Sequence, residues 1–327
     1  MFIRFFKDNN PSSFFLLPAM VAVLWIVSFI EPTQIVNSQQ TMLYTLLAKP
    51  VMVYPFINSL VSFLIVVAEG LVLNQIVNSS EIITRRTFLP ALFYIVWMSN
   101  NPSLLCFHPA LIANLFLILC LNSLLTSFRR NNAFSNAFDA GLFLAFASML
   151  YFPSIILFPV IFIGLIIFRT YNWREWLISI LGFAVPYSFV FTYYFWFDKL
   201  PEYWKHITSY FVYHDKPSFD FPSSFYLMFV VGCFIVLLAL SQMMNFIRSG
   251  SQKTKKNLIF INWFLLFAIL SIAVAPDLVS PNYSVLAIPL SVFTANYFLN
   301  MKKEWLGELL FLFFLVTILI SDFSKYF

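Results

Sequence analysis

The chain has 327 residues, of which 61% are apolar, 20% aromatic and only 10% charged, and its formal net charge is +5. Soluble domains average about 45–50% apolar and about 25% charged residues, so a mean hydropathy of +0.85 with 43 Phe excludes a soluble globular protein. The 19 basic residues stand in small groups between apolar runs, which is typical of membrane topology signals and excludes a nucleic-acid partner.

Eleven apolar runs follow one another along the chain. Because a hydrocarbon core of roughly 30 Å needs about 20 apolar residues per helix, they predict an all-α integral membrane protein with about eleven transmembrane helices. The expected spans are residues 14–30, 52–76, 87–99, 104–127, 139–151, 153–168, 175–197, 224–246, 257–275, 283–300 and 305–321. The third, fifth and sixth are short, so neighbouring helices must shield them.

The charges orient these spans. With the N-terminus in the cytoplasm, 14 of the 19 Lys and Arg residues fall in inner segments and five in outer ones, as the positive-inside rule requires. No Gly-rich linker divides the chain, so we expect a single polytopic membrane domain over residues 1–327. Its longer external segments are 31–50 and 197–222.

The first external segment contains a single acid, Glu31, at the mouth of the first span. A carboxylate in this place is a candidate general base. The alternative is that Glu31 merely ends the helix and stays hydrated. The stretch from Met42 to Ala48 that follows predicts a short helix at the membrane interface.

The second external segment alternates charged and aromatic side chains. Glu202 and His206 are four residues apart, so on a helix they share a face and suit a hydrogen-bonded pair or two ligands of a metal. Two ligands without a third nearby are a weak metal signal, and none of the three Cys has C-x-x-C spacing, so no metal site is expected. The alternative is an aromatic-rich amphipathic helix on the membrane surface.

Polar residues also occur at membrane depth. Glu69 lies inside the second span, and Asn114 and Asn122 lie on the fourth. An ionisable residue in a span indicates a functional site, but no Lys, Arg or His stands ready at membrane depth as a relay partner, since His108 lies close to the outer mouth. Hydrogen bonding between helices is therefore the expected role of these side chains.

One stretch, Ser99 to Trp196, has a pattern shared with known membrane proteins. An expected helix ends in the basic pair Arg129-Arg130, and a small-residue hairpin then begins at Phe138-Asp139-Ala140-Gly141. A further helix reaches Arg169, and the helix after it contains Gly182 and Pro186. The stretch resembles the middle of GT-C type membrane glycosyltransferases. It resembles more closely a family of multi-pass inner-membrane proteins of unknown function from Bacteroidetes.

The resemblance implies a GT-C-like helical bundle in the bacterial inner membrane, with a polyprenyl-phosphate-linked sugar donor at the outer leaflet. Glu31 would be the catalytic base, although GT-C enzymes usually place an Asp there. A divalent metal would assist only if the chain is an enzyme, and no other cofactor is expected. The basic residues of the site would neutralise the diphosphate of the donor, and the remaining residues would contact its sugar. This predicted substrate-binding set is Lys49, Lys199, Glu202, Tyr203, Trp204, Lys205 and His206.

Two other functions remain open. In the first, the same fold is a non-catalytic subunit or assembly platform of a cell-envelope complex, and its Phe-rich faces bind lipids and partner helices. The scarcity of acids, His and Gly at plausible reaction centres favours this function. In the second, a transporter, Glu69 and the amides would line an aqueous path, but the sequence shows no internal repeat.

Overall fold

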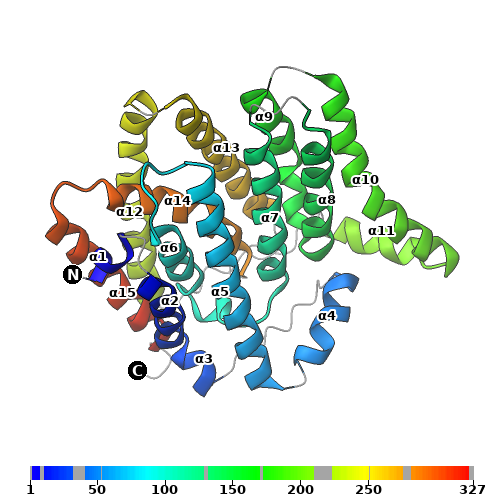
Figure 1. Ribbon diagram of the computed structural model, residues 1–327. Coiled ribbons are helices and arrows are strands. Elements are labelled where there is room, and N and C mark those ends of the chain that lie inside the picture. Colours follow the sequence, from blue (N-terminus) through cyan, green and yellow to red (C-terminus); the bar gives the residue numbers. More distant parts are fainter. Residues whose placement is uncertain are drawn as a thin grey trace.

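A computed structural model describes residues 2–7, 11–31, 41–52, 54–128, 132–169, 172–209, 223–249, 251–274 and 281–323. These residues form fifteen α-helices and three short 3-10 helices (Figure 1). The first half contains α1 (Phe2–Lys7), α2 (Pro11–Leu24), α3 (Ile26–Ile30), α4 (Met42–Met52), α5 (Pro55–Ser79), α6 (Leu89–Met98), η1 (Pro102–Leu104), α7 (Pro109–Thr126) and α8 (Phe134–Leu150). The second half contains η2 (Phe152–Leu157), α9 (Phe158–Phe168), α10 (Trp173–Trp196), α11 (Leu200–Ser209), α12 (Ser223–Ser249), α13 (Gln252–Val274), η3 (Pro281–Leu286), α14 (Ala287–Leu299) and α15 (Glu304–Phe323).

The all-α prediction is confirmed, and each expected span coincides with one or two of these helices. Within the described residues, six segments are helical, long and apolar enough to cross a membrane, and they belong to α5, α7, α10, α12, α13 and α15. The expected short spans are short: α6 has 10 residues, α8 has 17, and the sixth span is a 3-10 helix followed by the 11 residues of α9. The first span is broken at Trp25. The total of about eleven crossings stays a prediction.

Three ion pairs lie among segments that the charge count assigns to the inner side. They are Lys7–Glu304 at 3.5 Å, Arg169–Glu175 at 2.8 Å and Lys253–Glu81 at 3.3 Å. Two side chains of α13 add hydrogen bonds to the same turn after α5: Thr254 donates to the Glu81 carbonyl and Asn257 to the Ser80 carbonyl. The loops that contain these residues form the basic end of the bundle.

The opposite end is closed by α4, and we call it the α4 end. Thr41, just before α4, donates a hydrogen bond to the Leu150 carbonyl at the end of α8, and the Tyr44 hydroxyl donates to the Phe107 carbonyl. The stretch from Met42 to Ala48 is therefore helical, as expected, and lies over the segment between α6 and α7; its position at the membrane interface stays a prediction. Thr41 and Tyr44 belong to the external segment 31–50, and Leu150 and Phe107 lie near the outer ends of expected spans, so these contacts lie on the predicted outer side.

Helix α10 is attached to the bundle chiefly through α8, and α10 and α11 form its margin (Figure 1). The two helices approach at Gly141 and Gly182. A Cβ at Gly182 would overlap the Phe138 carbonyl oxygen, and one at Gly141 would overlap that of Ser179. Small residues that let backbones approach this closely are typical of membrane helix pairs.

Candidate functional site

Glu69 is a buried acid in the interior of the helix bundle. It is fully buried, ten residues before the end of α5, which places it about 15 Å along the helix from the basic end and near the middle of a bilayer core of roughly 30 Å. The hydroxyl of Tyr94, on α6, donates a 2.8 Å hydrogen bond to its Oε2 atom. The other carboxylate oxygen, Oε1, has no hydrogen-bond partner among the described residues.

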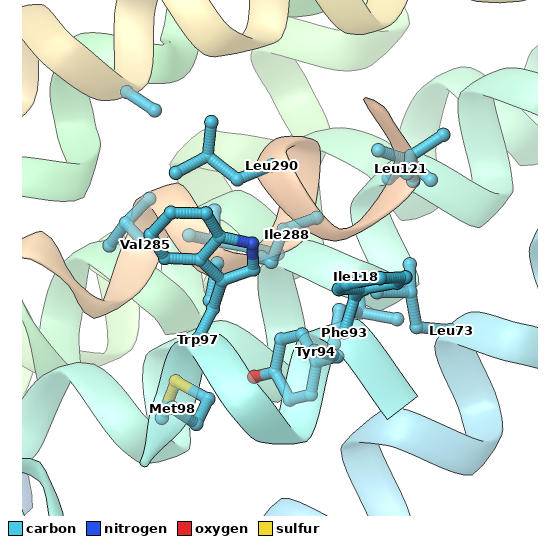
Figure 2. Packing of buried hydrophobic residues seen from close by; sticks show 14 of the residues in the cluster. Leu73, Phe93, Tyr94, Trp97, Met98, Ile118, Leu121, Val285, Ile288 and Leu290 are labelled. Carbon is cyan, nitrogen blue, oxygen red and sulfur yellow. The ribbon is translucent and has the colours of Figure 1, made fainter. Parts of the chain in front are cut away.

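Asn114 connects this acid to a second helix and to η3. It lies on α7, is fully buried and faces the Tyr94 hydroxyl. Its side-chain nitrogen donates to the Ser284 carbonyl at 3.2 Å and lies 3.9 Å from the sulfur of Met98. Figure 2 shows Tyr94, Trp97 and Met98 leaving α6 among apolar residues of the core. The Oδ1 atom of Asn114 has no hydrogen-bond partner in the described part of the chain.

A largely buried segment, residues 99–108, joins α6 to α7 and contains no α-helix, only the short 3-10 helix η1. Its backbone is held by side chains: Asn101 Oδ1 accepts the Ser103 N–H at 2.9 Å, and Asn58 Oδ1 accepts the Phe107 N–H at 2.8 Å. His108 caps α7 by accepting the Leu111 N–H at Nδ1, 3.1 Å away. Because Nδ1 is an acceptor, a neutral His108 carries its proton on Nε2.

The segment 99–108 meets η3 through polar side chains. The Tyr283 hydroxyl faces Asn101 and Ser103 but forms no well-aligned hydrogen bond with either. We define the buried polar cluster as the residues linked in this way, namely Glu69, Tyr94, Asn101, Ser103, Asn114, Tyr283 and Ser284. Ser284 joins it through its backbone carbonyl, and Asn101, Ser103 and Tyr283 are half-buried as whole residues. An unsatisfied buried polar atom costs about 1–3 kcal/mol, so a cluster with several such atoms needs a further partner.

The predicted external site is distributed over three elements. Glu31 is exposed at the end of α3, and Lys49 is exposed on α4. The remaining members lie at or on α11, where Lys199, Glu202, Trp204 and Lys205 are exposed. The side chain of His206, the rest of the loop after Glu31 and residues 210–222 lie outside the described residues. Among the described residues, the Glu31 carboxylate forms no hydrogen bond or ion pair, so its role as a base stays a prediction.

Tyr203 is the most enclosed member of the predicted site. Its ring stacks on Tyr194 with centroids 4.5 Å apart and contacts Phe191 edge-on at 5.9 Å. Partial burial raises the pKa of the Tyr203 phenol above its usual value, so the hydroxyl stays neutral. These contacts hold α11 against α10. They explain the position of the Tyr203 ring, so no bound ligand is needed to explain it.

The sequence indicated Glu69 and Asn114 but missed their partners. The clusters Ser99-Asn-Asn-Pro-Ser103 and Pro281-Asn-Tyr-Ser284 are the signal that was available, because polar residues and Pro break an apolar run there. Tyr94 gave no signal, since tyrosine is common in apolar helices. Within the described residues, no group of three or more His, Cys, Asp and Glu side chains is arranged to hold a metal.

Helix length and hydropathy define the chain as a multi-pass membrane protein. It belongs to a family of unknown function, DUF6427, whose model matches residues 40–327. Comparison with curated proteins and with solved structures finds no match. The matched region includes the buried polar cluster but begins after Glu31. The family match gives no link to GT-C transferases.

Proposed function

We propose that this protein is a non-catalytic membrane subunit that assembles a cell-envelope complex, and that α10 binds a transmembrane helix of a partner protein. The observation that supports this proposal is the exposure of α10. In the 18-residue apolar segment of α10 that is long enough to cross a membrane, only 17% of the residues are buried, compared with 61% in the corresponding segment of α7 and 39% in that of α5.

The two sides of α10 differ in what they contact. Ser179, Gly182 and Pro186 are buried on the side that packs against α8. Ala184, Ser188 and Thr192 are exposed and follow one another at four-residue intervals, so they form a stripe on a different side. The hydroxyls in this stripe are satisfied by their own backbone, with Ser188 donating to Val185 and Thr192 donating to Ser188.

A stripe of small residues at this spacing is the common surface for close packing of a second membrane helix. Large apolar side chains flank it: Phe189 and Phe195 are each 72% exposed, and Trp196 is 79% exposed. A partner helix would bury them, and small residues between large ones provide the ridges and grooves that helix packing needs. This arrangement supports an apolar helix as the occupant.

Photo-cross-linking in living cells tests this proposal. Benzoylphenylalanine would replace Phe189 on α10 or, as the matched control, Phe15 on α2, which is 75% exposed. We expect a cross-link to one specific envelope protein from position 189 only, and its loss when Ala184, Ser188 and Thr192 are changed to Leu. Equal cross-linking from both positions, a cross-link between two copies of this chain, or cross-linking to lipid alone would overturn the proposal.

The competing proposal is a transferase that uses a polyprenyl-phosphate-linked sugar at the outer leaflet, with Glu31 as base. It needs Glu31, Lys49 and the α11 residues to enclose one donor. The exposed positions of Glu31 and Lys49 leave both accessible to solvent, but they do not favour this function over the subunit. Substitution of Glu31 separates the two proposals.

A further inference from the structure

We propose that the buried polar cluster binds a chain of water molecules that leads from the α4 end to Glu69, and that Glu69 exchanges a proton with the aqueous phase on that side. By the charge count, this is the outer side of the membrane. The proposal does not depend on the partner helix of α10.

Among the residues that the structure describes, Glu69 has no cationic partner. The helices packed against α5 are α2, α3, α4, α6 and α7. Their titratable or charged side chains are Tyr94 on α6, Cys120 on α7, and Tyr44 and Lys49 on α4; α2 and α3 contain none. Lys49 is exposed at the α4 end, and the Tyr44 hydroxyl is bound to the Phe107 carbonyl. A carboxylate at this depth without a cation is strongly disfavoured, so Glu69 is protonated at rest.

The hydrogen bonds around the carboxyl group specify where its proton lies. Tyr94 donates to Oε2, which leaves Oε1 as the oxygen that carries the proton. A protonated Oε1 needs an acceptor. The Oδ1 atom of Asn114 is a buried acceptor without a partner among the described residues, and Asn114 belongs to the same cluster.

Further atoms without partners continue from Asn114 toward the α4 end. Within the described part of the chain they are Ser284 Oγ, Tyr283 OH and Ser103 Oγ, each of which both donates and accepts. A buried water typically makes about three hydrogen bonds to polar groups that otherwise lack partners. A file of waters beside these hydroxyls satisfies them and carries a proton along the same path.

The backbone gives independent support. Residues 99–108 and the 3-10 helix η3 face one another in the half of the bundle toward the α4 end. Backbone without α-helical hydrogen bonding is tolerated at membrane depth where it is buried in protein or lines a water-filled cavity. Here the two segments supply Asn101, Ser103, Tyr283 and Ser284, which are the polar groups such a cavity requires.

The exchange is a simple proton transfer. From the protonated resting state, the O–H bond at Glu69 Oε1 breaks as a neighbouring water takes the proton and becomes hydronium, and the Tyr94 hydroxyl and the backbone N–H of Leu115, which both face the carboxylate, support the transient negative charge. A hydronium arriving along the waters then forms the O–H bond at Oε1 again as its own O–H bond breaks.

Infrared spectroscopy of membranes containing the purified protein tests this proposal. We expect a carboxylic-acid C=O band that shifts in D2O, disappears in Glu69→Gln and persists in Glu304→Gln, which changes an exposed acid. The rate of this shift reports how fast D2O exchanges with Glu69 along the path from the α4 end. Ser103→Ala combined with Tyr283→Phe should slow it roughly tenfold, the factor expected for about one lost hydrogen bond in the path.

A variant that keeps Glu69 provides a second measurement. Tyr94→Phe removes the donor to Oε2, so the band of a protonated Glu69 should move to the higher frequency of a free carbonyl. Absence of a Glu69 band, a band that does not exchange, exchange at the wild-type rate in the Ser103→Ala, Tyr283→Phe variant, or a Tyr94→Phe spectrum identical to wild type would each overturn the proposal.

Discussion

The glycine contact between α8 and α10 yields a prediction whose magnitude follows from the structure. In Gly182→Ala, the new Cβ overlaps the Phe138 carbonyl and lies 3.0 Å from its carbonyl carbon. Both atoms belong to the backbone and cannot rotate away, so the helices must separate by roughly 1 Å to restore ordinary contacts. Such overpacking typically costs about 1–3 kcal/mol, and a rigid backbone contact belongs at the upper limit.

Helix propensity opposes this cost. Replacing Gly by Ala inside a helix stabilises it by about 1 kcal/mol, so we expect Gly182→Ala to destabilise the protein by about 2 kcal/mol. Gly70→Ala is the matched control, because its Cβ would meet its nearest neighbour, the Ala91 carbonyl oxygen, at an ordinary 3.5 Å. That variant should be neutral or stabilised by up to about 1 kcal/mol.

Unfolding can be followed with a thiol-reactive dye. Cys106 and Cys120 are buried and report on loss of the core, whereas the exposed Cys233 is first replaced by Ser. Gly141→Ala should destabilise by a similar amount, and the double variant by less than the two effects added, because one separation of the helices relieves both overlaps. If Gly182→Ala unfolds like Gly70→Ala, the close backbone approach of α8 and α10 is refuted.

Three further predictions address function, stability and topology. Glu31→Gln and Glu31→Ala should leave envelope phenotype and protein level at wild-type values in a complementation assay; loss of function at normal protein level would instead favour the transferase. Glu175→Leu should lower the free energy of unfolding by up to about 3 kcal/mol in the dye assay, because it removes the carboxylate that lies 2.8 Å from the largely buried Arg169 side chain. Adding Arg169→Met to the same chain should recover part of this loss, because the unpaired charge is then removed. With Cys233 replaced, a cysteine at position 31 should react with an impermeant maleimide in intact cells, whereas one at Lys253 should react only after permeabilisation; the opposite pattern would invert the predicted orientation.

The external site was the least accessible to sequence reasoning. Glu31 was chosen because it is the only acid in its loop, yet the structure leaves it exposed just after α3, while the residues grouped with it lie on α4 and at α11. Alternation of charged and aromatic residues predicted an amphipathic helix here, and α11 is a helix; its position on the membrane surface stays a prediction. It carried no information on whether Tyr203 would face a ligand or, as observed, the ring of Tyr194.

The sequence by itself determined that this chain is a helical membrane protein, where its helices lie and which of them are short. These properties are local, because each span must supply enough consecutive apolar residues to match the bilayer. Only the tertiary structure brought Glu69, Tyr94, Asn114 and Ser284 together, from α5, α6, α7 and η3. Which faces of these helices meet is decided by their rotation and register, and these follow from side-chain packing between segments far apart in the chain.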